Sequence, residues 1–305
     1  MSSRLACLLL AASLAVALFP AGATGEPSND RPYLGPADPG GTWVPSRPRP
    51  KSVLWAFGDG ADGGTEGKRL AAMLAAHPMH RLLYLGDVYP KGSAQDFQQN
   101  YAGAFGALAA RTAPVIGNHE WQDRANGYIP YWTAVRGAPA PMYYDFSVSG
   151  WQLLALNTNA PADPVQLQWL HDRIAATPRF GSCRIAVFHH PRYSASTNHG
   201  DAPAVEPLWA ALAGHARLAL SGHDHTSQRL QPSRGITQFV AGTAGTKLYG
   251  LDPADPRLAF GDIAHHAALR LALRPGRAVA AFVSSDGARL DRSRYRCKQG
   301  RPARR

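Results

Sequence analysis

Three apolar runs within residues 53–120 each end in a glycine that is followed by a residue able to bind a metal ion. They read VLWAFGDG at 53–60, LLYLGDVY at 82–89 and APVIGNHE at 113–120. Each run has the length of a buried strand, and amphipathic stretches of helical length lie between them, from about 65 to 76 and from about 94 to 108. Strands that alternate with helices in this way predict βαβ units and a parallel sheet.

The second half of the chain contains more hairpin patterns. Apolar runs flank a turn at Ser149-Gly150 and another at Pro275-Gly276, and a helix is expected from about 165 to 176. Two further runs end in His189-His190 and in the tetrapeptide Gly222-His223-Asp224-His225. Because no clean boundary divides residues 52–291, we expect one α/β domain with two sheets over this range.

The net charge of the chain, +11 at pH 7, raises the question of nucleic-acid binding. Residues 292–305 hold seven basic and no acidic residues, and Arg4 is the only charge in 1–23, so residues 24–291 contain 24 basic against 21 acidic residues. The sequence therefore predicts a basic C-terminal tail and no specific nucleic-acid binding. With 45% hydrophobic and 17% charged residues, the chain is not disordered as a whole.

The N-terminal segment has the layout of a secretory signal. Residues 1–23 contain Arg4, an apolar run over 5–19 and the small residues Ala21-Gly22-Ala23. This pattern predicts cleavage near Ala23, no stable membrane span, and a secreted or periplasmic location. Residues 24–51 are rich in proline and glycine and are expected to form an extended lead-in.

Cysteine use is consistent with export. Cys7 would leave with the signal, so that the mature chain keeps Cys183 and Cys297. An oxidising compartment permits these two to pair, and the bridge would hold the C-terminal tail to the domain. The sequence leaves both possibilities open, a disulfide and two free thiols.

Metal-ligand residue types gather where strands are expected to end. In open α/β sheets, ligands bind beyond the carboxyl ends of the strands, so side chains that are scattered in the sequence can meet there. One such residue alone is as well explained as a hydrogen-bonded turn residue. Several in one chain indicate a metal site; they are Asp59, Asp87, Asn118, His189, His223 and His225.

These motifs resemble a known family. Their order, GDG at 58–60, GDVY at 86–89, GNHE at 117–120, HHPRY at 189–193 and GHDH at 222–225, resembles that of the calcineurin-like metallophosphoesterases, and within them the purple-acid-phosphatase-like branch. The resemblance covers about 52–225. It implies a β-sandwich of two mixed sheets flanked by helices, with a dinuclear metal centre at the ends of the strands.

The resemblance also implies a ligand set. Asp59, Asp87 and His225 would hold the first metal ion; Asn118, His189 and His223 would hold the second, with Asp87 bridging. Carboxylate and amide oxygens together with imidazole nitrogens suit iron paired with iron, zinc or manganese. The His-x-His spacing of 223 and 225 places both rings on one side of an extended segment.

The ligands expected for the first metal ion depart from the family's common pattern. The family's Asp-x-His motif would need a histidine at 61, where this chain has Ala61. Purple acid phosphatases supply a tyrosine three residues after the bridging aspartate, whereas Tyr89 follows Asp87 by two. In an extended turn these positions share a face, so we expect Tyr89 to coordinate; a tyrosine packed beside the site is the alternative.

Four further residues receive roles from the resemblance. His119 is expected to contact the leaving oxygen or a phosphoryl oxygen, and His199 to contact phosphate and protonate the leaving group, unless it is an exposed loop histidine. His190 is expected to pack beside the site, and Asp224 to lie in the turn or orient a ligand imidazole.

The function implied is hydrolysis of small phosphate monoesters by metal-activated water, in an enzyme of the acid phosphatase type. A phosphodiesterase acting on cyclic nucleotides or phospholipid head groups is the alternative. A dinucleotide site through Gly58, Gly60 and Gly63 is a remote one, because Asp59 and Asp62 would place carboxylates in the phosphate cradle. The sequence makes no prediction of oligomeric state.

Overall fold

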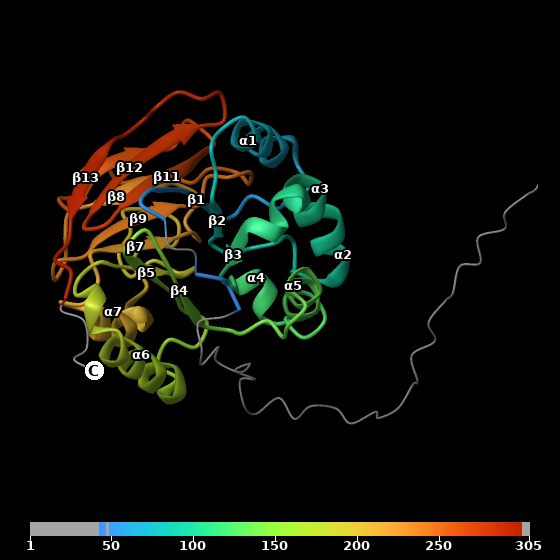
Figure 1. The fold of residues 1–305 in the computed structure, drawn as a ribbon. Coiled ribbons are helices and arrows are strands. Elements are labelled where there is room, and N and C mark those ends of the chain that lie inside the picture. Colours follow the sequence, from blue (N-terminus) through green and yellow to red (C-terminus); the bar gives the residue numbers. More distant parts are fainter. Residues whose placement is uncertain (1–42, 47–48, 301–305) are drawn as a thin grey trace, which may run out of the picture. The chain divides into compact units, whose positions relative to one another are not determined.

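The computed structural model describes residues 43–46 and 49–300, all within one compact unit. The predicted signal, 1–23, lies outside the described residues, as do residues 24–42, 47–48 and 301–305. Two mixed sheets form the body of the unit (Figure 1), as the resemblance implied. The strands of the first sheet are, in spatial order, β13 (Ser293–Arg296), β12 (Arg277–Ser284), β11 (Ala267–Arg274), β1 (Ser52–Phe57), β2 (Arg81–Tyr84) and β3 (Thr112–Pro114).

The second sheet has seven strands. In spatial order they are β10 (Leu258–Asp262), β8 (Ser227–Leu230), β9 (Thr237–Ala241), β7 (Leu218–Ser221), β6 (Arg184–Val187), β5 (Trp151–Ala155) and β4 (Tyr144–Val148). Strands β1, β2 and β3 are parallel, and so are β5, β6, β7 and β9. Parallel pairing brings the carboxyl ends of these strands to a common edge in each sheet.

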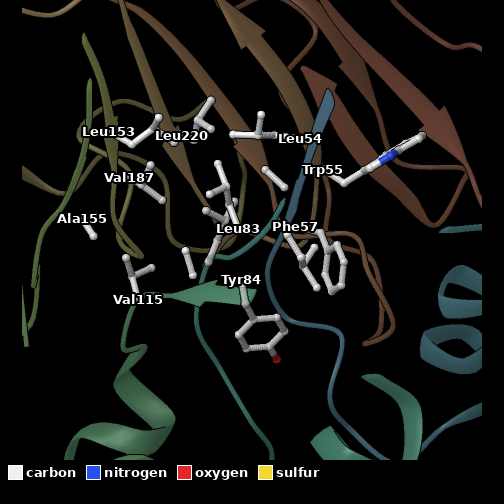
Figure 2. Packing of buried hydrophobic residues seen from close by; sticks show 14 of the residues in the cluster. Leu54, Trp55, Phe57, Leu83, Tyr84, Val115, Leu153, Ala155, Val187 and Leu220 are labelled. Atoms are coloured by element: carbon white, nitrogen blue, oxygen red, sulfur yellow. The ribbon is translucent and has the colours of Figure 1, made fainter. Parts of the chain in front are cut away.

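One hydrophobic core joins the two sheets. Leu54 and Leu83 from the first sheet meet Leu153, Val187 and Leu220 from the second (Figure 2), and all are buried. Burial of each such side chain contributes about 1.5–3 kcal/mol. Parallel strands that are covered on both faces explain why these runs are apolar throughout rather than alternating.

Helices flank the sheets. Their bounds are α1 (Thr65–Ala75), α2 (Ala94–Asp96), α3 (Ala102–Phe105), α4 (Asn118–Trp121), α5 (Tyr128–Arg136), α6 (Pro164–Ala176) and α7 (Glu206–Leu212). Asp163 caps α6 by accepting hydrogen bonds from the first-turn backbone N–H groups, with Pro164 following it. A second core cluster lies on the seven-stranded sheet and includes Leu170 of α6 and Trp209 of α7. The helix predicted from 94 to 108 is continuous but irregular, because a π-helical turn (Phe97–Tyr101) follows α2 and a 3₁₀ turn (Gly106–Arg111) follows α3.

Both ends of the described chain pack onto the domain. In the expected lead-in, Trp43 and Val44 are buried, and the Trp43 indole donates to the carbonyl of Ala138 (3.2 Å). In the expected basic tail, residues 293–296 form β13, where Tyr295 is buried between exposed arginines. A disulfide joins Cys297 to Cys183 just before β6. Within the described residues, no helix has the length and apolar character needed to cross a membrane.

Candidate metal centre

The predicted ligands lie at the carboxyl ends of five strands. Asp59 follows β1, Asp87 follows β2, and Asn118 follows β3; His189 follows β6, and His223 and His225 follow β7. The turns there are tight: Asp59, Asp87 and His223 have positive φ angles of 61°, 69° and 71°. A left-handed backbone at a residue other than glycine has an energetic cost that functional sites often carry.

Four side chains meet around a first point. The Tyr89 hydroxyl lies 3.1 Å from Asp59 Oδ1, 3.3 Å from Asp87 Oδ2 and 2.9 Å from His225 Nε2. His225 Nε2 is 3.7 Å from Asp59 Oδ1. Donor atoms that bind one ion at about 2.1 Å lie about 3 to 3.5 Å apart, so these separations fit a shared cation.

A second group of donor atoms adjoins the first. Asn118 Oδ1 lies 2.9 Å from His189 Nε2 and 3.0 Å from His223 Nδ1. His189 Nε2 is also 3.3 Å from Asp87 Oδ2, the oxygen that contacts Tyr89. Asp87 Oδ2 therefore belongs to both groups, which is the arrangement that a bridging carboxylate requires.

Backbone carbonyls orient two of the imidazoles. His189 Nδ1 lies 2.7 Å from the carbonyl oxygen of Leu85, and His225 Nδ1 lies 2.8 Å from that of Lys247. Because a carbonyl only accepts, each Nδ1 carries the proton and donates it. When the ring is neutral, Nε2 carries the lone pair and faces the donor group, as in most histidine metal ligands.

The electrostatics of the centre favour a cation. Burial raises the pKa of Asp59, and the neighbouring Asp87 carboxylate raises it further. Burial also works against ionisation of Asp87, but His189 outweighs it and holds the pKa of Asp87 well below its usual range. In return, the two carboxylates overcome burial and raise the pKa of His189 to about 10. Among the described residues, the ion-pair partners of these carboxylates are histidines.

Glu120 supports the bridging aspartate, a role that the sequence analysis did not assign. It is 1% exposed, and its Oε2 accepts the backbone N–H of Asp87 at 3.0 Å. The same turn cannot hold a larger residue at Gly117, because a Cβ there would lie 2.0 Å from Asp87 Oδ1. The GNHE motif thus supplies both an expected ligand, Asn118, and the side chain that fixes the Asp87 turn.

His119 lies beside Tyr89 of the first donor group, and His199 lies beside His223 of the second. His119 has a side chain that is 36% exposed, its Nε2 lies 3.9 Å from Asp87 Oδ2, and its ring lies 4.3 Å from that of Tyr89. A cleft of about 670 Å³ opens beside it and is lined in part by Lys91 and Gln122. The ring of His199 stacks on that of His223 at 4.3 Å.

The two remaining expected residues lie at the second donor group. The ring of His190 is 4.5 Å from that of His223, and burial lowers the pKa of His190 to about 3. Asp224 is fully buried, and its Oδ1 accepts the backbone N–H of His199 at 3.4 Å. Asp224 lies in the turn after β7, where its backbone N–H donates to the carbonyl of Gly222 (2.9 Å), and its carboxylate also holds the loop that carries His199.

Tyr249 is a component that the sequence analysis missed. Its ring stacks on His225 with the centroids 3.9 Å apart, and its backbone N–H donates to the carbonyl of His225 (3.0 Å). It belongs to the glycine-rich segment AGTAGTKLYG, 241–250, which directly continues β9. A glycine-rich stretch at the end of a strand was the available signal.

The glycines of GDGADG are explained by close packing. A Cβ at Gly60 would lie 2.6 Å from Ala244 Cβ, and one at Gly58 would lie 3.3 Å from the Cα of Gly222. Asp59, between them, is fully buried and joins the donor group. The motif is thereby accounted for without a dinucleotide.

Sequence comparison places the chain in a family. The model of the family described as "Calcineurin-like phosphoesterase" matches residues 46–227. The chain therefore belongs to the calcineurin-like phosphoesterases, as the order of its motifs predicted. No curated protein matches it.

Solved structures share the fold. GAP50, "the anchor in the inner membrane complex of Plasmodium", has a TM-score of 0.69 at 14% identity and covers 83% of this chain and 90% of its own. Purple acid phosphatase PPD1 from yellow lupin (Lupinus luteus) seeds has a TM-score of 0.68 at 15% identity, over 83% of this chain and 55% of its own. A dimetal phosphatase from Danio rerio has a TM-score of 0.56 at 14% identity, over 82% of this chain and 100% of its own. Identities this low show the fold alone, and the two-sheet prediction is confirmed.

Proposed function

We propose that this protein is a dinuclear-metal phosphoesterase that hydrolyses monoesters of phosphoric acid with small alcohols. The observation that carries the proposal is the shared position of Asp87 Oδ2, which lies 3.3 Å from Tyr89 of one donor group and 3.3 Å from His189 of the other. Two adjacent groups of buried oxygen and nitrogen donors joined by one carboxylate match the requirements of a two-cation site.

The ligands follow from the two donor groups. Asp59, Asp87, Tyr89 and His225 would hold one cation, and Asp87 would share the other with the set Asn118, His189 and His223. A phenol oxygen suits trivalent iron, and the second group suits iron, zinc or manganese. When bound, such a pair of cations polarises the phosphoryl oxygens, lowers the pKa of water and offsets the charge of the transition state.

His119 is our candidate contact to the leaving oxygen or to a phosphoryl oxygen. Its Nδ1 donates to the carbonyl of Pro90 (2.6 Å), which leaves Nε2 on the side of the cleft and of Asp87. His199 is our candidate contact to phosphate and proton donor to the leaving group; its ring stacks on His223, and Asp224 accepts its backbone N–H. Proton transfer by one positioned histidine commonly contributes a factor of about 10²–10⁴ to the rate.

The diester alternative has one observation in its favour. The cleft of about 670 Å³ beside His119 has room for a substituent on a second ester oxygen. Its lining includes residues of both charge signs, among them Lys91 and Asp123. Polar head groups would fit such a lining, and the substrate panel below separates the two classes.

We also propose that the protein works outside the cytoplasm. The disulfide between Cys183 and Cys297 supports this, because such bridges persist in oxidising compartments. The expected signal at 1–23 is the second support. Mass determination of protein recovered from the cell exterior or periplasm, with an N-terminus near Thr24, is the corresponding test.

The catalytic test combines elemental analysis with a chromogenic monoester and diester panel. We expect two metal ions per chain and a preference for monoesters in the wild type. Asp87→Asn removes the shared charged oxygen, so turnover should fall to background and bound metal should decrease. Asp62→Asn is the matched control, because Asp62 lies in the neighbouring turn but its side chain contacts the backbone of Gly64.

Three results would contradict the proposal. Unchanged turnover in Asp87→Asn would remove the metal assignment. A diester preference in the wild type would select the alternative substrate class. A wild-type protein that binds two metal ions but hydrolyses neither class would favour a non-enzymatic role for the site.

A further inference from the structure

His190 borders the second donor group, and among the described residues a hydrogen-bond partner is recorded for one of its ring nitrogens, Nδ1. Its Nδ1 lies 3.0 Å from the hydroxyl oxygen of Thr158. Single ligand-type atoms of His189, His190 and His223 lie within 4.8 Å of one another, so His190 is close enough either to bind a metal ion or to contact what the metals bind. The proton position on the ring decides between these roles.

The hydrogen bonds of Thr158 favour one position for that proton. The Thr158 hydroxyl oxygen accepts the backbone N–H of His190 at 2.9 Å; the oxygen has a second lone pair, but its single proton also needs an acceptor. Within the part of the chain that the structure describes, the acceptor recorded for its own proton is His190 Nδ1. Because a neutral imidazole carries one proton, Nε2 then bears it. An N–H group cannot bind a metal ion, but it donates well to an anionic oxygen.

The loop that carries Thr158 is firmly held. It follows β5, and the side chain of buried Gln166 accepts the backbone N–H of Asn157 (2.7 Å) and donates to its carbonyl (3.0 Å). Asn159 donates to the carbonyls of Ile116 and Gly117, both at 3.3 Å, which ties the loop to the strand end that precedes Asn118. Thr158 is therefore held in a fixed position relative to Asn118 and to His190.

We propose that His190 donates a hydrogen bond from Nε2 to a phosphoryl oxygen of the substrate, and that Thr158 is the positioning residue that fixes its tautomer. This inference rests on the proposed phosphoesterase function and extends it. His190 belongs to the substrate site rather than to the metal ligands, and the residue that controls it comes from a loop without a family motif.

The test measures inhibition by inorganic phosphate, KM and metal content in the full chain. His190→Ala should weaken phosphate inhibition and raise KM about 10- to 100-fold, the range for losing a hydrogen bond to a charged group, while two metal ions per chain remain. His190→Gln should recover much of the loss, because its amide N–H reaches the position of Nε2. Thr158→Val should act in the same direction by a few-fold, and Thr158→Ser should restore wild-type values.

Each other outcome overturns the inference. Loss of one metal ion in His190→Ala would make His190 a ligand. Full metal content with unchanged phosphate inhibition would make it a packing residue. If Thr158→Ser behaves like Thr158→Val, Thr158 acts through packing. A wild type without metal or turnover would refute the proposed function itself, and phosphate binding by calorimetry that is equal in wild type and His190→Ala would then also exclude the phosphate contact.

Discussion

The Tyr89 hydroxyl lies among the atoms of the first donor group, whereas residue 61 is an alanine without a donor atom. The hydroxyl contacts Asp59, Asp87 and His225 within 3.3 Å. Burial and the two carboxylates raise the pKa of Tyr89, so by itself the phenol stays protonated and donates to them. Only a strongly polarising cation would convert it into a phenolate, and this makes Tyr89 a sensitive reporter of which ion is bound.

Replacement of Tyr89 by phenylalanine should therefore change the colour of the iron-loaded protein. With Fe(III) bound, we expect a visible phenolate-to-iron charge-transfer band in the wild type and none in Tyr89→Phe. Tyr249→Phe is the control, because its ring stacks on His225 at 3.9 Å and keeps that contact without a hydroxyl. Optical spectra of protein with known iron content provide the measurement. An active, iron-loaded wild type that is colourless would exclude Tyr89 as a ligand.

At the residue scale, the sequence indicated which side chains gather but not what holds them. Asp59, Asp87 and His189 were predictable because each directly follows an apolar strand, and parallel strands end at one edge. Thr158 and Tyr249 were not, because each comes from a loop whose path is set by tertiary packing. A threonine or tyrosine in a loop is too common to stand out without that path.

Strands were the most predictable elements, and short helices the least. The runs near 53–57, 185–188 and 218–220 became β1, β6 and β7, since buried parallel strands are apolar throughout. Helices α5 and α7 were not anticipated. α7 has only seven residues, with Pro207 near its start, so it offers too few turns for a periodic pattern.

The loop that carries His199 depends on an ionic network at this scale. Arg257 Nη1 lies 2.7 Å from Asp201, and its Nη2 lies 2.6 Å from Asp255. Asp201 in turn accepts the backbone N–H of Ser194 at 2.8 Å. The arginine thus joins the 194–201 loop to the segment that follows Tyr249.

Arg257→Gln should loosen this loop and destabilise the fold modestly. The side chain is 39% exposed, so we expect about 1 kcal/mol or less at pH 7, together with a raised KM and unchanged metal content. Hydrogen bonding to Arg257 lowers the pKa of Asp255 below its usual value of 3.8. The stabilisation is therefore present above that pH and is lost as the pH falls through the lowered pKa.

Urea unfolding of wild type and variant at pH 7 and pH 3 measures this difference. The gap in unfolding free energy should be smaller at pH 3. A gap that grows on acidification would contradict the assignment.

At the scale of the whole molecule, the disulfide changes the interpretation of the positively charged C-terminal segment. The basic segment after Asp291 is anchored in part, because β13 pairs with β12 and Cys297 is bonded to Cys183. The sequence allows a disulfide between Cys183 and Cys297, but whether the two cysteines are neighbours in space depends on how the two sheets pack.

Removal of the disulfide should lower stability without removing activity. The bridge closes a loop with a sequence separation of 114, so Cys183→Ala with Cys297→Ala should reduce the free energy of unfolding by about 2–4 kcal/mol. Cys183 precedes β6 while His189 follows it, and the site should stay intact in the folded variant. Denaturant unfolding with and without reductant tests this. Equal stability of wild type and double variant under oxidising conditions would show that the bridge contributes nothing.

The left-handed backbone at Asp59, Asp87 and His223 has an evolutionary consequence. Among the described non-glycine residues, only Ser149 and Arg234 share such positive φ angles. Glycine would adopt these three turns more readily but would remove two buried carboxylates and an imidazole, so stability and the proposed metal binding make opposite demands on the same positions. A descendant released from catalysis should drift toward glycine there while its strands stay unchanged. The residue types at these three positions would therefore distinguish relatives that keep the proposed metal chemistry from relatives that keep only the fold.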